Sequence, residues 1–340
     1  MSASELEATV GALGIDLGNT NTVVCAARSE LLLEEPSVML LRDSGARRPK
    51  VAAVGHDARS LVGRTSNGVS AVRPLRDGVI TDLDTAQAYI RAVLHKLAPH
   101  RWQRLRIHAV VGVPLGATPL ERRALLEAAE EAGLHRPALL AEPIAGAIGC
   151  GIDPLDRRTH LAVDIGGGTA EVTAFCFGEV VAHRSSRVAG DEMTMAVFHH
   201  LREQHGILLG ELDAEDIKVR CSTEEGPTIA VAGRDAATGR PKVATVTIEE
   251  LQAAMRPVID AIVQTLAACM DDLPPQSVGD VLSEGLLAFG GGSLARGVHH
   301  RLDEALGFSV KPAERPLTCV AEGAAKALRD RRLLDAFRGW

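Results

Sequence analysis

Two copies of one short pattern, far apart in the chain, most strongly limit what this sequence can fold into. Residues 14–24 read GIDLGNTNTVV and residues 161–175 read LAVDIGGGTAEVTAF, so that Asp16 aligns with Asp164. Each copy predicts an apolar half-strand that ends in Asp, a tight turn of Gly, Asn and Thr, and a second half-strand. Glycine lets the backbone approach a ligand closely, and successive turn amides bind anions. Two such hairpins, one in each half of the chain, predict a clamp on a polyphosphate.

An aspartate in each hairpin indicates how the phosphate charge is balanced. The sequence has no GxxxxGK[ST] motif, and the glycine turns lead into strands, which excludes a P-loop lysine. Backbone amides, hydroxyl groups and a divalent cation remain as the balancing groups. We therefore expect Asp16 and Asp164 to hold Mg²⁺, mainly through water, because this ion keeps much of its hydration shell. The alternative role for each Asp is to cap its turn.

Three further features fit beside this clamp. The hydroxyl of Thr169, three residues after Gly166, would face the terminal phosphate, although a lone Thr in a turn is usually a backbone cap. A third glycine cluster, at 290–293, follows an apolar strand. Glu142 precedes a helix of small residues and could orient a water for attack on a phosphate. From the residues alone, a surface acid near a helix start is the favoured interpretation of Glu142.

The remaining composition is typical of a soluble globular protein. The chain has 340 residues, enough for two domains, and a formal net charge of −7. It lacks a long basic run, which argues against a nucleic-acid binder. Its six cysteines show no CxxC or zinc spacing, so we expect reduced core thiols. Because neither a signal peptide nor a membrane span of about 18–20 apolar residues is found, we expect a cytoplasmic protein.

The hydrophobic periodicity predicts strands alternating with helices. Strands are expected at 14–26, 107–113, 161–177 and 286–289, and helices at 82–97, 118–133 and 247–270. The last two helices each begin with a capping box, and Pro257 is expected to kink the second of them. Strand–strand–helix order recurs in both halves, which predicts an α/β protein with two related sheet domains around a cleft. Polar segments at 34–65 and 192–242 are predicted to form small subdomains on the cleft walls.

These motifs, in this order, resemble the actin/heat-shock-chaperone/sugar-kinase ATPase superfamily and, within it, the MreB family of bacterial actins. GIDLGNTNT and VDIGGGTAEV resemble the two phosphate motifs, and LAFGGGSLARG resembles the adenosine motif. AEPIAGAIG and PLTCVAEGAAKAL resemble the two connecting helices, while RVAGDEM and ELDAEDIK fit the insertion of the second domain. The resemblance covers nearly all of 14–328.

The resemblance implies an actin-like ATPase fold, in which two related domains, each a mixed sheet with helices and a small subdomain, enclose a nucleotide cleft. Domain I would comprise 1–145 with 316–340, and domain II would comprise 146–315. The subdomain insertions would lie at about 33–70 and about 185–242.

Carried over by position, the resemblance also implies site residues for ATP or ADP with Mg²⁺. Phosphate and metal would be contacted from one side by Asp16, Gly18, Asn19, Thr20 and Asn21, and from the other by Asp164, Gly166, Gly167, Gly168 and Thr169. Glu142 would orient the hydrolytic water, with Asp164 and Thr169 facing the bond that is cut. Ribose and adenine would lie near Glu211, Glu215 and Lys218, above Gly291, Gly292 and Ser293.

The sequence departs from the family pattern at four positions. Ala141 stands where the family usually has a Glu, Asn19 and Ala170 each replace a common Thr, and Phe289 replaces a small or polar residue. None of these changes removes a group assigned to the chemistry, so the resemblance still implies ATP hydrolysis.

The implied function is a slow, polymerisation-coupled ATPase that forms cytoskeletal filaments and serves cell shape and cell-wall morphogenesis. A magnetosome-type or other specialised bacterial actin is the nearest alternative, followed by a chaperone-like ATPase or a small-molecule kinase. Expected partners are further copies of the chain, the cell-wall elongation machinery and the inner membrane surface through the loop around Trp102, but not nucleic acid. A C-terminal apolar stripe, from Leu333 to Trp340, is expected either to dock on the domain or to mediate association.

Overall fold

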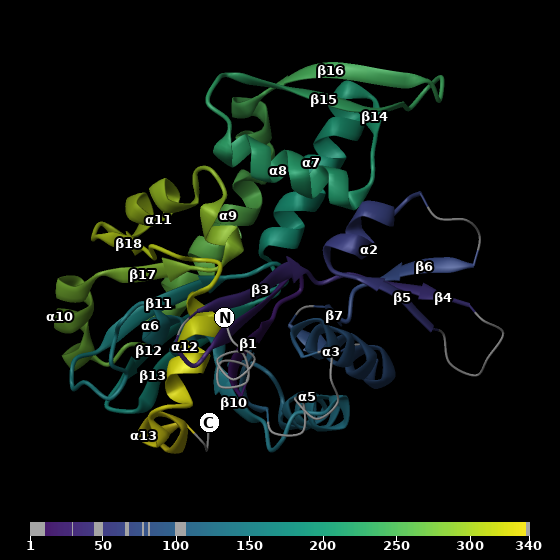
Figure 1. Cartoon of the computed structure of the whole chain (residues 1–340). Coiled ribbons are helices and arrows are strands. Elements are labelled where there is room, and N and C mark those ends of the chain that lie inside the picture. Colours follow the sequence, from purple (N-terminus) through teal and green to yellow (C-terminus); the bar gives the residue numbers. More distant parts are fainter. Residues whose placement is uncertain are drawn as a thin grey trace.

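Two five-stranded sheets form the centre of the molecule (Figure 1). The computed structural model describes residues 11–28, 30–43, 50–64, 68–76, 78–80, 82–98 and 107–337. The first sheet has the strand order β10-β9-β1-β2-β3 and the second β13-β12-β11-β17-β18. The first contains β1 (Ala12–Leu17), β2 (Asn21–Ala26), β3 (Leu31–Pro36), β9 (His108–Val113) and β10 (Ala138–Ala141). The second contains β11 (His160–Ile165), β12 (Ala170–Cys176), β13 (Glu179–Ser186), β17 (Leu286–Phe289) and β18 (Val310–Pro312).

The two large sheets share one internal plan. In each, the strand that carries the Asp pairs antiparallel with the strand that follows it, β1 with β2 and β11 with β12. The second strand of each hairpin pairs antiparallel with a third strand, β3 or β13. The first strand of each hairpin pairs parallel with β9 or β17 on its other side. The two predicted hairpins are therefore confirmed, as equivalent elements of a duplicated α/β arrangement.

The helices begin where the sequence predicts them. The carboxylate of Asp82 accepts a hydrogen bond from the Thr85 amide at the start of α3 (Leu83–Leu97). Both α5 (Pro119–Ala132) and α9 (Ile248–Asp271) begin with the expected capping boxes. The other helices outside the central pair and the small units are α7 (Gly190–His205), α10 (Pro275–Glu284), α11 (Val298–Leu306) and α13 (Arg331–Ala336).

Two central helices link the large sheets. Helix α12 (Cys319–Ala327) contacts β1, β2 and β9 of the first sheet. Helix α6 (Glu142–Gly149) contacts β9 and β10 of the first sheet and β11 and β12 of the second, and α6 and α12 pack on each other. A Cβ atom on Gly323 of α12 would lie 1.7 Å from the carbonyl oxygen of Ala145 in α6. The small residues of these helices are therefore explained by backbone-to-backbone packing, which no larger side chain permits.

Each half of the chain also carries a smaller three-stranded sheet. One sheet consists of β4 (Met39–Arg42), β5 (Lys50–Val54) and β6 (Val69–Val72), with α2 (His56–Leu61) beside it. The other consists of β14 (Ile207–Leu208), β15 (Thr228–Asp235) and β16 (Pro241–Thr247), with α8 (Glu211–Thr223). A two-stranded hairpin, β7 (Leu75–Arg76) with β8 (Val79–Ile80), follows β6 along the chain.

The small sheets lie within the segments predicted as insertions, with different boundaries. Residues 33–36, assigned to the first insertion, belong to β3, which is hydrogen-bonded to β2 of the large sheet. In the second half, β16 extends to Thr247, past the predicted limit at 242, because its whole length pairs with β15. The division of the chain into domains I and II at the predicted limits stays a prediction.

By length and composition alone, helix α9 is long and apolar enough to cross a membrane. Its most apolar stretch of 18 residues has a mean hydropathy of 1.3. Its side chains Leu251, Met255 and Ile262 are buried in one hydrophobic cluster with Val172 of β12. Helix α9 also contacts α7, β12 and β13. These contacts show that one face of α9 packs in the core of the second half, while 28% of the apolar stretch as a whole is buried.

The C-terminal apolar stripe docks on the molecule. Leu333 and Phe337 are buried in a cluster with Phe289 of β17 and Ala327 of α12, whereas Trp340 lies outside the described residues. The cysteines are free thiols, and Cys25, Cys221, Cys269 and Cys319 are buried as expected. The expectation of a core thiol is wrong for Cys150, which is exposed because it caps the end of α6.

Candidate functional site

The turns of the two hairpins are closed in the same way. In the first turn the Gly18 amide donates a hydrogen bond to the Asn21 carbonyl at 3.0 Å. In the second turn the Gly166 amide donates to the Thr169 carbonyl at 2.8 Å. The equivalence predicted from the two sequence copies thus extends to individual backbone hydrogen bonds.

The first turn is held against its neighbours by two of its side chains. A Cβ atom on Gly167 would lie 2.3 Å from Thr20 Oγ1, so the two turns touch too closely for a side chain at that position. Asn19 is 5% exposed, and its Oδ1 accepts a hydrogen bond from the Gly78 amide at 2.9 Å. Asn19 and Thr20, predicted as phosphate ligands, therefore also fix the position of the turn.

A narrow cavity of about 80 Å³ lies between the turns. Three carboxylates border it: Asp16 from β1, Asp164 from β11 and Glu142 from the start of α6. The predicted phosphate ligands also line this cavity, namely Gly18, Asn19, Thr20, Asn21, Gly166, Gly167, Gly168 and Thr169. The structure thus brings together the residues assigned to phosphate, metal and water.

The three carboxylates make this cavity strongly acidic. Burial raises the pKa of Asp16 to about 7. Burial, and then the charges of Asp16, Asp164 and Glu171, raise the pKa of Glu142 well above its usual range. The pKa of Asp164 is likewise raised by burial and by Asp16. Among the residues that the structure describes, none forms a hydrogen bond or ion pair with the side chains of these three acids. Because oxygen ligands of high negative charge suit Mg²⁺, the donor set fits that ion.

The narrow cavity continues into a wider one of about 280 Å³, close to the size of a small-molecule site. Thr20, Asn21, Gly166 and Gly167 line both cavities. The wall of the wider cavity consists of residues of α8 and of the 3₁₀ helix η1 (Gly291–Leu294), including Glu215, Lys218, Val219, Ser222, Gly291, Gly292 and Leu294. The predicted adenosine residues Glu215, Lys218, Gly291 and Gly292 are therefore brought together beside the phosphate residues.

Lys218 and Glu215 form a buried ion pair in that wall. Lys218 Nζ is 2.7 Å from Glu215 Oε2, and the two residues are 8% and 9% exposed. The same Nζ donates hydrogen bonds to the Gly190 carbonyl and to Thr194 Oγ1, both at 2.9 Å. Because Gly190 and Thr194 belong to α7, the ion pair holds α8 against α7 and fixes one side of the cavity.

Two predicted ligands do not face the cavity. Glu211 lies one helical turn before Glu215 and lines other hollows that also contain Arg73, so its assignment to ribose or adenine is not supported. Ser293 is 1% exposed, and its hydroxyl donates to the Gly290 carbonyl at 2.7 Å. Ser293 therefore shapes the third glycine cluster from within.

Two residues that the sequence analysis left without a role also belong to this site. The carboxylate of Asp191, near the start of α7, accepts a hydrogen bond from Thr20 Oγ1 at 3.3 Å and pairs with Arg73. Leu317, before α12, lines both cavities. Asp191 could have been found from the sequence, because it lies in the segment RVAGDEM, which resembles a family motif. No sequence pattern marks Leu317 as a site residue.

Phe289, one of the four departures from the family pattern, does not narrow the cavity. The side chain is fully buried, and a Cβ atom on Gly146 of α6 would lie 2.2 Å from its ring. The absence of a side chain at Gly146 makes room for the ring between β17 and α6. The wider cavity is therefore formed by other residues.

The duplicated sheets, the facing hairpins and the two central helices define an actin-like fold. The sequence model of the family described as "MreB/Mbl protein" matches residues 10–336. The chain therefore belongs to the MreB/Mbl family and is a bacterial actin homologue.

Individual relatives agree with this assignment. The chain is 38% identical over 321 residues to the cell shape-determining protein MreB of Escherichia coli, which covers 93% of this chain and 92% of that protein. It is 35% identical over 322 residues to the cell shape-determining protein Mbl of Bacillus subtilis, covering 93% and 95%. The crystal structure of MreB5 of Spiroplasma citri bound to AMPPNP matches with a TM-score of 0.85 and 27% identity, over 94% of this chain and 96% of that one. The MamK double helical filament shares the fold, with a TM-score of 0.76 and 22% identity over 94% and 98% of the two chains.

Proposed function

We propose that this protein binds ATP with Mg²⁺ in the narrow cavity and the wider cavity that continues from it. It would polymerise in the ATP-bound state and hydrolyse the nucleotide slowly. The observation that carries the proposal is the meeting of three acids, Asp16, Glu142 and Asp164, with two glycine turns at the narrow end of a wider cavity. The turn amides would bind the phosphates, and α8 with η1 would enclose the adenosine. The Spiroplasma relatives bound to AMPPNP and to ADP support a nucleotide as the ligand.

Asp16 and Asp164 are the residues that would hold Mg²⁺ in this proposal. The bound ion would offset the charge of these acids and of the phosphates. The amides of the two turns would orient the terminal phosphate between the hairpins, and Thr169 would donate its hydroxyl to that phosphate.

Glu142 is the proposed water-orienting residue. It begins α6, borders the narrow cavity and has a pKa well above that of a surface Glu because it is buried among other acids. In its deprotonated form a carboxylate at this position can accept a proton of the attacking water. Since α6 packs on α12 between the two large sheets, a small movement of one half relative to the other would change the position of this carboxylate. Polymerisation would then accelerate hydrolysis by favouring the arrangement that places the water correctly.

Filament formation and a role in cell shape follow from the family. The relatives include cell shape-determining proteins, and one surface used head-to-tail gives an open filament. Attachment to the inner membrane through the loop around Trp102, and contact with the cell-wall elongation machinery, are finer parts of the proposal. Residues 99–106, which include Trp102, lie outside the described residues.

A sedimentation assay tests the proposal. Purified protein is centrifuged at high speed with ATP and Mg²⁺, with ADP and Mg²⁺, or with ATP and EDTA, and pellets are imaged by electron microscopy. We expect filaments and a large pelleted fraction with ATP and Mg²⁺, a smaller one with ADP and none with EDTA. Equal pelleting in all three conditions, or none at high protein concentration, would contradict nucleotide-dependent polymerisation. Adding anionic liposomes, with Trp102→Ala as the matched variant, tests membrane attachment separately.

A further inference from the structure

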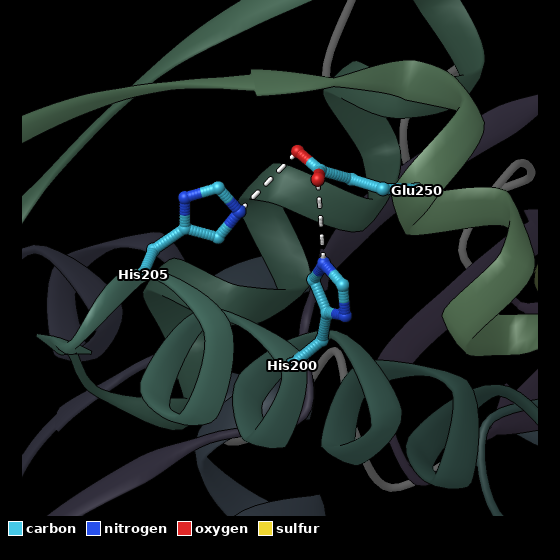
Figure 2. Close-up of side chains that lie close together, drawn as sticks. All are labelled: His200, His205 and Glu250. Carbon is cyan, nitrogen blue, oxygen red and sulfur yellow. Dashed lines mark ion pairs between the residues drawn. The ribbon is translucent and has the colours of Figure 1, made fainter.

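Helices α7 and α9 bring three potential metal ligands together at a place separate from the nucleotide cavity. His200 and His205 lie in the last two turns of α7, and Glu250 lies in the first turn of α9. His205 Nε2 is 3.3 Å from Glu250 Oε1, and His200 Nε2 is 3.8 Å from Glu250 Oε2. Figure 2 shows that each imidazole ring directs one nitrogen toward the carboxylate. The three ligand atoms lie within 4.8 Å of one another.

Both histidine nitrogens are buried and have no hydrogen-bond partner among the residues that the structure describes. This holds for Nε2 of His200 and for Nε2 of His205. Their separations from the Glu250 oxygens, 3.8 and 3.3 Å, are longer than a normal N–H···O bond. A buried polar atom without a partner lowers stability, and two such atoms facing the same carboxylate require a physical explanation.

A bound metal ion accounts for these separations. Ligand atoms at about 2.0–2.2 Å from a tetrahedral Zn²⁺ lie about 3.3–3.6 Å from one another. The 3.3 Å between His205 Nε2 and Glu250 Oε1 lies in that range, and the 3.8 Å between His200 Nε2 and the other oxygen, Oε2, is slightly longer. Two imidazoles with one carboxylate are a ligand set suited to zinc and similar transition metals, whereas Mg²⁺ prefers oxygen ligands only.

We propose that His200, His205 and Glu250 bind one divalent transition-metal ion of the zinc class. The three side chains are 18%, 20% and 30% exposed, so the ion can reach the site and a water molecule can take the fourth position. The proposal is independent of nucleotide binding, because none of the three residues lines either nucleotide cavity.

The ligands are held in place by bonds that do not involve the metal. Glu250 Oε1 accepts a hydrogen bond from the Thr247 amide at 2.6 Å as part of the capping box of α9. The carbonyl of His205 accepts a hydrogen bond from Lys242 Nζ at 2.7 Å, and Gly206 ends α7 in the left-handed conformation. Such support reduces the ordering required when the ion binds.

The position of this site indicates what the ion does. Helix α7 ends at His205 directly before β14, and α9 begins at Ile248 directly after β16. The unit formed by β14, β15, β16 and α8 is therefore connected to the rest of the chain at these two points, which lie side by side because His205 Nε2 is 3.3 Å from Glu250 Oε1. The ion would link the end of α7 to the start of α9 and so hold together the two points at which this unit is connected to the chain. Any ion that binds only the folded state also stabilises it.

Metal titration of the full-length, untagged protein tests the proposal. The protein is stripped with EDTA, dialysed and titrated with Zn²⁺ without nucleotide, and dissociation constants are measured by competition with a chromophoric chelator. We expect one ion per chain in the His/Glu site and a higher thermal unfolding midpoint with Zn²⁺. His200→Gln and His205→Gln should each raise the dissociation constant at least about tenfold. His199→Gln, which changes the neighbouring residue on α7, is the matched control and should leave it unchanged.

Cobalt absorption separates this site from binding by the free cysteines. Co²⁺ bound at His200, His205 and Glu250 would show ligand-field bands without the near-ultraviolet band of a cobalt–thiolate bond. Circular dichroism checks that the variants are folded, and Glu250→Gln, which keeps a capping oxygen, provides an independent third variant. The proposal is overturned if folded parent protein binds no stoichiometric Zn²⁺, if the three ligand variants bind it as the parent does, or if all binding is thiolate-based.

Discussion

Thr20 and Asp191 are joined by a hydrogen bond of 3.3 Å between Oγ1 and Oδ1, although 171 residues separate them in the sequence. Thr20 belongs to the first glycine turn, and Asp191 to the first turn of α7 in the second half. Asp191 also pairs with Arg73, and its amide donates to the Gly167 carbonyl at 2.7 Å. Asp191 therefore connects the first hairpin, the second hairpin and the segment before β7.

Removal of the Asp191 carboxylate should weaken nucleotide binding. In Asp191→Ala the backbone bond to Gly167 is kept, but the side-chain bonds to Thr20 and Arg73 are lost. Since a hydrogen bond contributes about 1 kcal/mol, we expect the dissociation constant for ATP to rise about three- to tenfold. Equilibrium binding of a fluorescent ATP analogue measures the change.

A second aspartate provides the matched control. Asp216 of α8 pairs with Arg59 of α2, and thus also joins the two halves, but its side chain is 58% exposed. Exposed ion pairs contribute little, so Asp216→Ala should change the ATP dissociation constant by less than about twofold. Equal effects of the two substitutions would show that the Asp191 side chain has no special role in holding the two glycine turns together.

Gly323 should be essential for the packing of the two central helices. A Cβ atom there would collide with the Ala145 carbonyl oxygen at 1.7 Å, and neither backbone can move without displacing a sheet. We expect Gly323→Ala to lower the free energy of unfolding by about 3 kcal/mol or more. Urea unfolding followed by circular dichroism measures this change.

Gly279 of α10 is the control for the same substitution in a helix. A Cβ atom there meets nothing within 4 Å, so Gly279→Ala should raise stability slightly through helix propensity, by about 0.5–1 kcal/mol. A Gly323→Ala protein as stable as the Gly279→Ala protein would contradict the described contact between α6 and α12.

His183 should make stability depend on pH. Burial lowers the pKa of this histidine below its usual value of 6.5, and its Nδ1 is 3.1 Å from Thr173 Oγ1. The unfolded state then binds more protons near and below pH 6.5, so stability is kept above that pH and lost as the pH falls through it. In urea unfolding at pH 7.5 and 5.5, His183→Gln should lose less stability than the parent. An equal or larger loss in the variant would contradict the neutral, buried state of His183.

The fold could be predicted wherever local spacing determines it. The capping boxes at Thr118 and Thr247 lie where α5 and α9 begin, and the two Asp–Gly patterns correspond to hairpins with the same closing bonds. Each of these features depends on residues within a few positions of one another. Single-chain spacing is enough for such features.

The site could be predicted only in part, because some of its features depend on contacts between distant segments. The role of Asp191 arises from Thr20 and Arg73, which lie far away in the sequence. The direction of the Phe289 side chain, which belongs to β17, depends on the space left by Gly146 in α6. The pair of histidines on α7 gained a third ligand only when the fold placed Glu250 beside them. Local sequence patterns contain none of these relationships.

The central claim, that Glu142 orients the water for ATP hydrolysis, is tested most directly by single-turnover hydrolysis with Glu142→Gln. ATP affinity and phosphate release are measured on the same protein preparation, at a concentration where the parent pellets with ATP. We predict that the variant binds ATP within about threefold of the parent and still polymerises, while its hydrolysis rate falls at least about 100-fold. Hydrolysis at the parental rate by a variant saturated with ATP would contradict the account.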